Sequence, residues 1–457
     1  MILVEKRYLN YPSKPHDYFT CLLLIIDESN LLCVLVKHVS IYVLFKYVCN
    51  MTFFLTSMDG GRPIPEDVVV DILLRLPVKS LLRFKCVRKN WCALIKSPSF
   101  IKEHFQYRNN NCARLLVCNM KMAPELHPIV KSVVFSLLPE EIVPGVTPEQ
   151  KTLLQLQRVT DFTCVAGPVN GLFLVEKSLY GVDVCLGLWN PATKEFRSLP
   201  PAPFEIEGFL SHNNDHQYGL GFDMSTLDYK VVWIRVFWDD LGLSDNNRVY
   251  TCVYSSCNNS WRRLTPKFPP SSILSAPLDA TYLNGVYYWL SRGLDGIFMI
   301  LSFDMVCEQF GEMQVPDIPT KHWGTLTLHG GSLVMLTSGQ PMTSIYDVWV
   351  MKQEGNWSKV HTIQPHIDAH WPINIWDNNK MVFENMETSQ LVLYDPKTRR
   401  VTDLGFQLDP NIDGCWVFNY KESLVPIKRG SNTQGEDNAV KQIEHYFNTL
   451  PADEASS

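Results

Sequence analysis

The sequence predicts a mainly β protein with a small α-helical module near its N-terminus. A block dense in leucine and basic residues, 64–95, has helical spacing, whereas the chain after it reads as short strands rich in β-branched and aromatic residues. These strands also return at regular intervals. With 46% hydrophobic and 19% charged residues, the 457-residue chain is globular and can hold one large and one small domain. We divide it into segments 1–57, 62–108, 109–428 and 429–457.

The first 57 residues are apolar, but Asp27, Glu28, Lys37 and Lys46 interrupt them. No run approaches the ~20 apolar residues of a membrane span, and no small-residue cleavage site follows a single apolar core. Two interpretations stay open: a membrane-associating leader, or an extension upstream of a true start at Met58. We favour the second, and without this segment we expect no membrane association.

The helical block begins at Pro65, where a proline and two acidic residues are typical of a first helical turn. Pro77 ends this helix, and Ser80 is the expected cap of a second. Apolar residues continue at helical intervals until Ser97-Pro98, which we expect to end the run. The pattern therefore predicts two or three short helices in about 45 residues.

A unit of this size cannot bury all its apolar side chains alone, so it needs a partner surface. A helical cap on the following domain would also satisfy the pattern. Nucleic-acid binding is a further alternative, because the basic residues of the block have no acid between them: Lys79, Arg83, Lys85, Arg88, Lys89 and Lys96. However, the second helix consists largely of apolar side chains and lacks the Asn/Gln/Arg cluster of a base-reading helix. The net charge of −6 likewise does not indicate a polyanion partner, and we expect no nucleic acid.

The block "IPEDVVVDILLRLPVKSLLRFKCVRKNWCALIKSPSF" resembles an F-box, over residues 62–108. The resemblance implies binding to a Skp-type adaptor and, through it, to the cullin and RING subunits of a ubiquitin ligase. That adaptor is acidic in the family, which fits the basic excess here. By position, the residues implied in the contact or in its supporting core are Pro65, Ile72, Leu73, Leu76, Pro77, Leu81, Val87 and Trp91.

Residues 109–428 contain a repeat. In each instance a strand leads through a turn to an apolar anchor, and the anchors are Phe196, Trp261, Phe310, Trp357 and Val401. The later intervals approach the period of about 50 residues of a kelch-type propeller blade. This predicts a kelch-like β-propeller, with a β-sandwich as the alternative. The strands near 114, 132 and 416 are expected to supply the closing blade.

The same region resembles the F-box-associated domain of plant proteins, in "GPVNGLFLV", "YGLGFDMSTLDYKVV" and "YLNGVYYWL". "NYKESLVPI" resembles the S-locus F-box subgroup and its relatives. Together with the F-box, this implies a substrate-recognition subunit of a Skp–cullin–F-box ubiquitin ligase, which binds an unknown client protein for ubiquitination. For the S-locus subgroup the client would be a style ribonuclease in self-incompatibility. We expect the protein in the cytoplasm, with the nucleus as a further location, and 429–457 as a flexible tail.

Client specificity is expected in exposed polar loops on one face of the propeller, at 205–217, 238–247 and 364–378. The candidate client-binding residues are aromatic or acidic: Phe209, Trp238, Asp239, Asp240, Asp368, Trp371 and Trp376. The alternative is that these are variable loops without a partner.

We find no sign of catalysis or of a cofactor. The 13 cysteines form no CxxC pair, and their odd number fits reduced thiols. The histidines and Asp368 of "HTIQPHIDAHW" lack a shared helical face, so we expect a structural loop and no metal there. A propeller enzyme would need ligands that converge on a central axis, which a sequence cannot reveal. We therefore expect a non-catalytic receptor.

Overall fold

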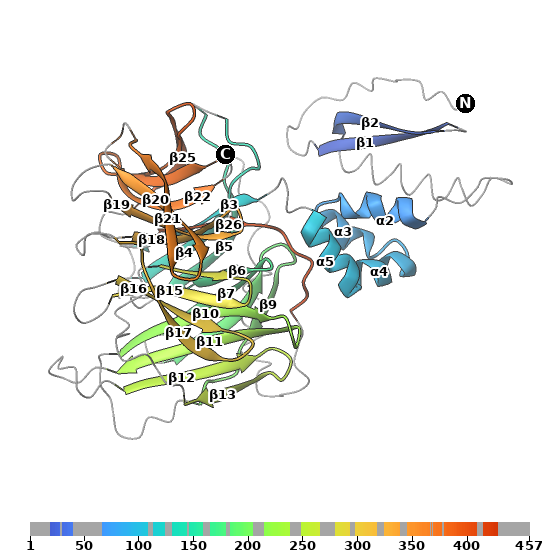
Figure 1. Cartoon of the computed structure of the whole chain (residues 1–457). Helices are drawn as coiled ribbons and strands as arrows, with labels where there is room; N and C mark the ends of the chain where they lie inside the picture. Colours follow the sequence, from blue (N-terminus) through green and yellow to red (C-terminus); the bar gives the residue numbers. More distant parts are fainter. Residues whose placement is uncertain are drawn as a thin grey trace. The chain divides into compact units, whose positions relative to one another are not determined.

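A computed structural model describes most of the chain in two compact units, Met1–Ile95 and Lys96–Ser457. The described residues are 19–27, 30–39, 66–107, 113–123, 130–143, 146–158, 165–179, 183–203, 214–237, 248–265, 279–292, 298–317, 324–338, 345–365, 367, 369–376, 379–408 and 415–427. Figure 1 shows the elements in chain order. The expected tail at 429–457 lies outside these residues.

The helical module contains more helices than predicted. These are α2 (Glu66–Leu74), α3 (Val78–Phe84), α4 (Lys89–Lys96) and α5 (Pro98–Tyr107). The expectation for Ser80 was wrong: Pro77 is the N-cap of α3, and Ser80 is a buried residue of its first turn. The Ser97-Pro98 pair does follow the end of α4 at Lys96, but the helical run continues beyond it as α5. Ser97 Oγ accepts a hydrogen bond from the N–H of Phe100, at 3.3 Å, and Pro98 is the first residue of α5.

Upstream of the helices, β1 (Phe19–Asp27) pairs with β2 (Asn30–Val39) as an antiparallel hairpin. Among the described residues, no helix is both long enough and apolar enough to cross a membrane.

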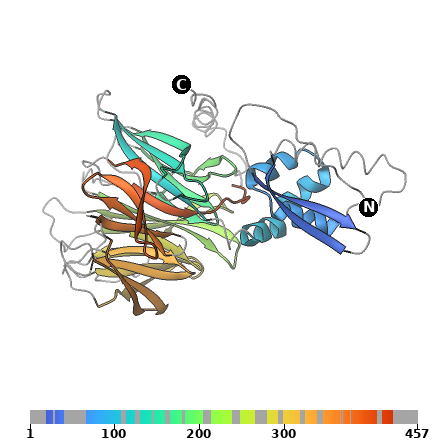
Figure 2. The same cartoon turned by 90° about the horizontal axis from the view of Figure 1, so that it is seen from above.

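The second unit is a β-propeller, as predicted, and not a sandwich, and its described strands form six blades (Figures 1 and 2). Each blade is an antiparallel sheet of four strands, and the strands are given from the centre of the ring outward. Blade A is β26 (Cys415–Tyr420), β3 (Arg114–Ala123), β4 (Val130–Leu137) and β5 (Lys151–Arg158); blade B is β6 (Val165–Val169), β7 (Leu172–Leu179), β8 (Asp183–Asn190) and β9 (Glu195–Ser198); blade C is β10 (Asn214–Asp223), β11 (Asp228–Phe237), β12 (Arg248–Ser255) and β13 (Ser260–Leu264). Blade D is β14 (Asp279–Leu283), β15 (Val286–Arg292), β16 (Phe298–Asp304) and β17 (Gln309–Gln314); blade E is β18 (Gly324–His329), β19 (Ser332–Ser338), β20 (Tyr346–Gln353) and β21 (Asn356–Ile363); blade F is β22 (Ala369–Trp376), β23 (Lys380–Asn385), β24 (Gln390–Asp395) and β25 (Arg400–Gln407).

The repeat found in the sequence is the outermost strand of blades B to F. Phe196, Trp261, Phe310, Trp357 and Val401 are each the second residue of β9, β13, β17, β21 and β25, respectively. Two of the tryptophans make equivalent bonds to the preceding blade. Trp261 Nε1 donates to the carbonyl of Pro200 at 2.7 Å, and Trp357 Nε1 donates to that of Gln314 at 2.9 Å. These two anchors therefore join blades C and E to the blades before them.

Blade A closes the ring with strands from both ends of the domain. β26 pairs with β3 in antiparallel register, with Tyr420 opposite Arg114 (Figure 1). This is the closing blade that the strands near 114, 132 and 416 predicted. Such closure leaves no free inner edge on the ring.

Several hairpin turns share a side-chain hydrogen-bonding pattern that was not predicted from the sequence. An Asn or Asp side chain ends one strand and accepts hydrogen bonds from the N–H groups two and three residues later, and the fourth residue has positive φ. The capping residues are Asn190, Asp223, Asp304, Asn385 and Asp395. The dipeptides Asn170-Gly171 and Asn284-Gly285 form two-residue turns, with positive φ at both positions.

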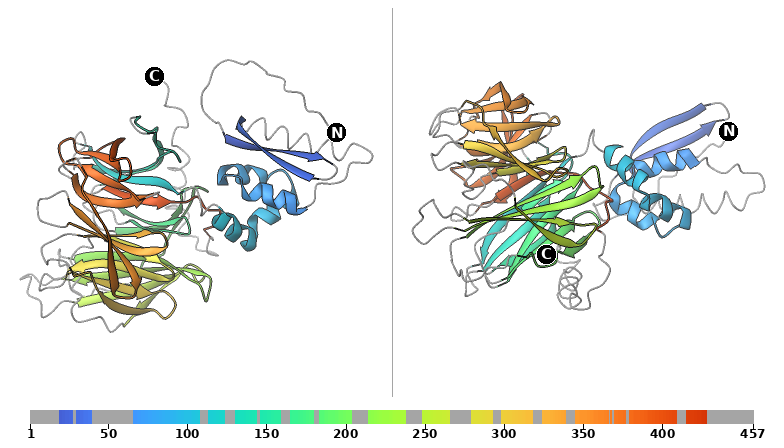
Figure 3. Two further views of the ribbon diagram at one scale, coloured as in Figure 1. Left: turned by 45° about the horizontal axis from the view of Figure 1, so that its top comes forward. Right: turned by 60° about the horizontal axis from the view of Figure 1, so that its bottom comes forward.

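The two faces of the propeller differ in the length of their connections. Where the first strand of a blade meets the second, and the third meets the fourth, blades B to F have turns of at most four residues. We call this the turn face. Blade A differs, because the longer segment 138–150 joins its β4 and β5 at this same end. The connections between the second and third strands of blades B to F and between successive blades, which include 199–213 and 238–247, lie at the opposite end, which we call the loop face. Figure 3 shows the blades from two further directions.

After β26 the chain crosses the turn face as an extended strap, Lys421–Ile427. The side chain of Asn190 is completely buried and donates to the carbonyls of Ser423, at 3.1 Å, and Val425, at 2.8 Å. Further along, the N–H of Ile427 donates to Glu195 at 3.0 Å. The strap is therefore hydrogen-bonded to blade B at three points.

Candidate functional site

The F-box-like residues divide into a buried group and an accessible group. Leu73 and Leu81 are at most 1% exposed and belong to the core of the module. Partly exposed are Ile72, Leu76, Pro77, Val87 and Trp91, whereas Pro65 lies outside the described residues. Trp91 packs against Phe84 with ring centres 5.7 Å apart. The accessible group therefore offers apolar side chains that a partner protein can cover.

The charge around this group is positive. The exposed basic residues of α3, α4 and the turn between them are Lys79, Arg83, Arg88, Lys89 and Lys96. Glu66 and Asp67 lie in the first turn of α2, and Asp71 pairs with Arg75 at 3.1 Å on its surface. No acidic residue lies between Lys79 and Lys96, so this part of the module favours an acidic partner surface.

Most candidate client-binding residues lie outside the described part of the chain: Phe209, Trp238, Asp239, Asp240 and Asp368. Trp371 lies in β22. The prediction of an exposed loop was wrong for Trp376, which ends β22 and is 4% exposed. Its Nε1 donates to the carbonyl of Ala113 at 2.9 Å, so this indole fastens blade F to the start of blade A. Residues 214–217 were also predicted as loop, but they are the first residues of strand β10.

The strands nevertheless bring the three predicted segments to one end of the propeller. Residues 199–213 join β9 to β10, 238–247 join β11 to β12, and 364–368 join β21 to β22. Each of these strand ends lies on the loop face. The short turns and the strap lie on the opposite face. The strands therefore lie between the turns and these three connecting segments.

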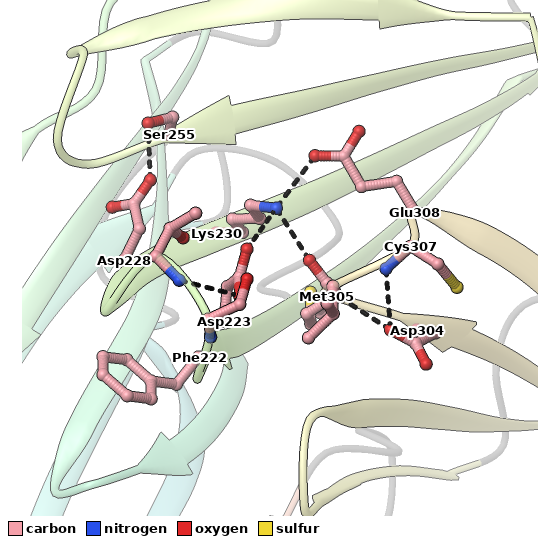
Figure 4. Close-up of polar contacts among 12 residues, drawn as sticks. Phe222, Asp223, Asp228, Lys230, Ser255, Asp304, Met305, Cys307 and Glu308 are labelled. Carbon is pink, nitrogen blue, oxygen red and sulfur yellow. Dashed lines mark hydrogen bonds and ion pairs between the residues drawn. The ribbon is translucent and has the colours of Figure 1, made fainter.

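The best-defined polar cluster, which the sequence did not predict, lies on the turn face between blades C and D (Figure 4). Lys230 Nζ donates to Asp223 at 2.8 Å, to Glu308 at 2.9 Å and to the carbonyl of Met305 at 2.7 Å. Arg262 also pairs with Glu308. Since an ammonium group has three donors and all three are used, this cluster is a clasp between blades.

The charges of the clasp shift its pKa values. Burial raises the pKa of Asp223, but hydrogen bonds from Lys230 and from the Ser225–Thr226 turn outweigh it and hold the pKa far below its usual value. In Glu308 burial is likewise outweighed by Lys230 and Arg262, so its pKa is lowered. A polar pocket of about 440 Å³ lies beside the clasp and is lined by its Lys230, Arg262 and Glu308, among others. The paired carboxylates leave it without a strong net charge.

Two further ionisable groups are shifted toward their neutral forms. Burial, and then the charge of Arg235, lower the pKa of His216 to about 4. Trp233 Nε1 donates to His216 Nδ1 at 3.0 Å, which requires a free lone pair on that nitrogen. Burial raises the pKa of Asp279 to about 8, against a hydrogen bond from Thr325. His216 lies on β10 and Asp279 on β14, both innermost strands, and each is hydrogen-bonded to a residue of a neighbouring strand. Among the described residues, no group of three or more metal-binding side chains occurs.

Comparison with known proteins agrees with this architecture. Residues 64–103 match the F-box domain, and residues 124–411 match the F-box associated beta propeller domain. The second match covers more than half of the chain. This chain belongs to the F-box proteins with an F-box-associated β-propeller.

Its relatives include plant F-box proteins of similar length. An F-box/kelch-repeat protein of Arabidopsis thaliana (At3g23880) is 29% identical over 79% of this chain and 94% of its own. The F-box protein CPR1 of the same plant is 26% identical over 83% of this chain and 91% of its own. Among solved structures, a chain of the nidogen/laminin complex aligns with a TM-score of 0.37 and 14% identity over 67% of this chain and 98% of its own. The domain combination of this F-box protein is that of substrate-recognition subunits of Skp–cullin–F-box ligases, which are typically non-catalytic.

Proposed function

We propose that this F-box protein binds a Skp-type adaptor through α2–α4 and presents a client protein bound on the loop face of its propeller. The observation that carries the proposal is the pairing of a partly exposed apolar group on the F-box helices with a propeller whose connections at 199–213, 238–247 and 364–368 all lie on one face. The adaptor would bring the cullin and RING subunits. The protein itself would supply proximity and orientation, not a reacting group.

The adaptor contact is proposed to consist of the accessible apolar side chains Ile72, Leu76, Pro77, Val87 and Trp91, with Pro65 as a further candidate. Leu73 and Leu81 would support the helices from within. The exposed basic residues would steer an acidic adaptor and raise the rate of association at low salt. Raising the salt concentration should therefore slow association more than it speeds dissociation.

Client binding is proposed for the loop-face segments 204–213, 238–247 and 364–368, with Phe209, Trp238, Asp239, Asp240 and Asp368 as contacts. Trp371 remains a candidate, whereas Trp376 is withdrawn because its indole is committed to the core. Aromatic and acidic side chains on loops can anchor a protein partner. The "NYKESLVPI" motif suggests a style ribonuclease as one client to test.

The test is a reconstitution of the full chain with a plant Skp-type adaptor, cullin and RING subunits. The expected result is one complex that transfers ubiquitin to a captured client. Exchanging 238–247 for the matching segment of a relative should change the captured client, whereas exchanging the turn-face residues 396–399 should not. Client capture that survives exchange of all three loop-face segments would overturn the assignment of that face.

A further inference from the structure

Helix α5 links the two functional parts of the protein. Its residues 98–103 belong to the F-box match, yet α5 falls in the same compact unit as the propeller. Phe100 and His104, one turn apart, are at most 1% exposed, and their rings stack 6.1 Å apart. Phe105 lies on the adjacent row of the helix and is partly exposed. The helix therefore has a second contact side, which carries Phe105.

On that side, Phe105 meets a lysine of the propeller. Lys421 Nζ lies 4.1 Å from the centre of the Phe105 ring. Lys421 is only 8% exposed, so its ammonium group is largely removed from water. A cation over an aromatic ring is most favourable under these conditions.

The backbone of Lys421 has little freedom to move. Tyr420, just before it, pairs with Arg114 in the closing blade. Behind it the strap is fixed by the two hydrogen bonds from Asn190. The carbonyl of Lys421 also lies so close to Gly171 that a Cβ there would come within 2.8 Å of it. Lys421 is thus a rigid point of the propeller.

The surroundings of this contact are only partly filled. A pocket of about 200 Å³ lies between α5 and the turn face, lined by Phe105, Asn170, Asn419 and Lys421, among others. The Phe105 ring and Lys421 both line this pocket, so the contact between them joins α5 to the turn face at its edge.

We propose that Phe105 and Lys421 form a clamp that fixes α5 on the turn face and so positions the adaptor-binding helices for ubiquitin transfer. The clamp deepens the proposed function and rests on it. In a ligase the reacting lysine must come within reach of the charged conjugating enzyme, and small errors of placement are costly. Phe105 and Lys421 are positioning residues and touch neither adaptor nor client in this scheme.

A distance measurement tests the clamp without any partner. Spin labels are introduced on unnatural amino acids at Glu103 on α5 and Asn258 on a turn of blade C, both exposed, so that the native cysteines can stay. The full chain should give one narrow distance distribution. Lys421→Met and Phe105→Leu should each raise the population outside that distribution by about 5- to 30-fold, and Lys421→Arg, which keeps the cation, should not. A distribution equally narrow in all four proteins would overturn the clamp.

The functional readout is the pattern of ubiquitin attached to the chain's own lysines in the reconstituted ligase, mapped by mass spectrometry. The two disruptive variants should bind the adaptor within about twofold of the full chain, because the accessible F-box residues are unchanged. Their transfer should be slower and spread over more lysines, and Lys421→Arg should restore both. The same ubiquitination pattern in all variants would contradict the positioning role. Failure of the chain without substitutions to bind the adaptor would instead refute the proposed function.

Discussion

At the scale of single residues, Lys230 shows how the propeller uses charge between its blades. Its side chain is 10% exposed, and its ammonium group is shared by two carboxylates and one carbonyl. A buried ion pair adds little net stability over an apolar pair of similar shape, but removing one partner leaves the other charge uncompensated. The clasp is therefore a sensitive point of the fold.

Replacing Lys230 with Met should lower the free energy of unfolding by about 3–5 kcal/mol, because Asp223 and Glu308 would keep buried negative charges. Chemical denaturation at neutral pH measures this loss. Lys397→Met, at an exposed turn position of blade F, is the matched control and should change stability by less than about 0.5 kcal/mol. Equal stability of the two variants would show that the clasp is not formed in solution.

His216 predicts a dependence of stability on pH. Its pKa is about 4 in the folded protein and near 6.5 in the unfolded chain, so the unfolded chain binds the proton more readily. The stability that neutral His216 contributes to the fold is complete above about pH 6.5. It is lost as the pH falls toward 4, which lowers the free energy of unfolding by on the order of 3 kcal/mol.

His216→Gln should remove this part of the pH dependence between pH 4 and 6.5, measured as urea midpoints across that range. His361→Gln, at an exposed position in β21, should leave it unchanged. A slope that persists in His216→Gln would mean that another group carries it.

At the scale of elements, the strap directly follows the closing strand β26 and joins it to blade B. Leu424 and Ile427 are at most 9% exposed within it, and Asn190 is fully buried beneath it. Burial of these side chains adds to the hydrogen bonds that hold the strap on blade B.

A chain that ends after Tyr420 should therefore lose about 3–6 kcal/mol of stability, the value of two buried aliphatic side chains. A chain that ends after Ile427 keeps the strap and should unfold at the same temperature as the full chain. Thermal unfolding of the pair compares them directly. Loss of stability in the longer truncation product as well would place the effect outside the strap.

The elements also show what a sequence can and cannot predict. The anchors such as Trp261 and Trp357 were visible because each blade repeats the same outer strand, and the closing blade followed from unpaired strands near 114 and 416. The Lys230–Glu308 clasp joins residues 78 positions apart, and no local pattern marks such a pair. Trp376 was taken for a loop residue because aromatic and polar residues alternate around it, yet the closing of blade F on blade A buries its indole. Local patterns thus predicted strands and turns, but not the contacts between blades.

At the scale of the whole molecule, the protein separates its connections by face. The chain enters at β3 and leaves from β26 on the turn face, where the strap also lies, and the connections at 199–213, 238–247 and 364–368 are on the loop face. A receptor of this design can change its client by altering loops without disturbing the turns and clasps that hold the blades together. The central claim, however, depends on the helices before the propeller.

The most direct test of that claim is the affinity of the full chain for a purified plant Skp-type adaptor, measured by calorimetry. The comparison is the Leu76→Asp, Trp91→Ala double variant, with Lys102→Ala on the exposed side of α5 as the control and circular dichroism to verify folding. We predict tight binding by the full chain and the control, and a loss of at least about 100-fold in the folded double variant. Absence of binding by the full chain, or equal binding by the double variant, would contradict the account of this protein as a ligase receptor.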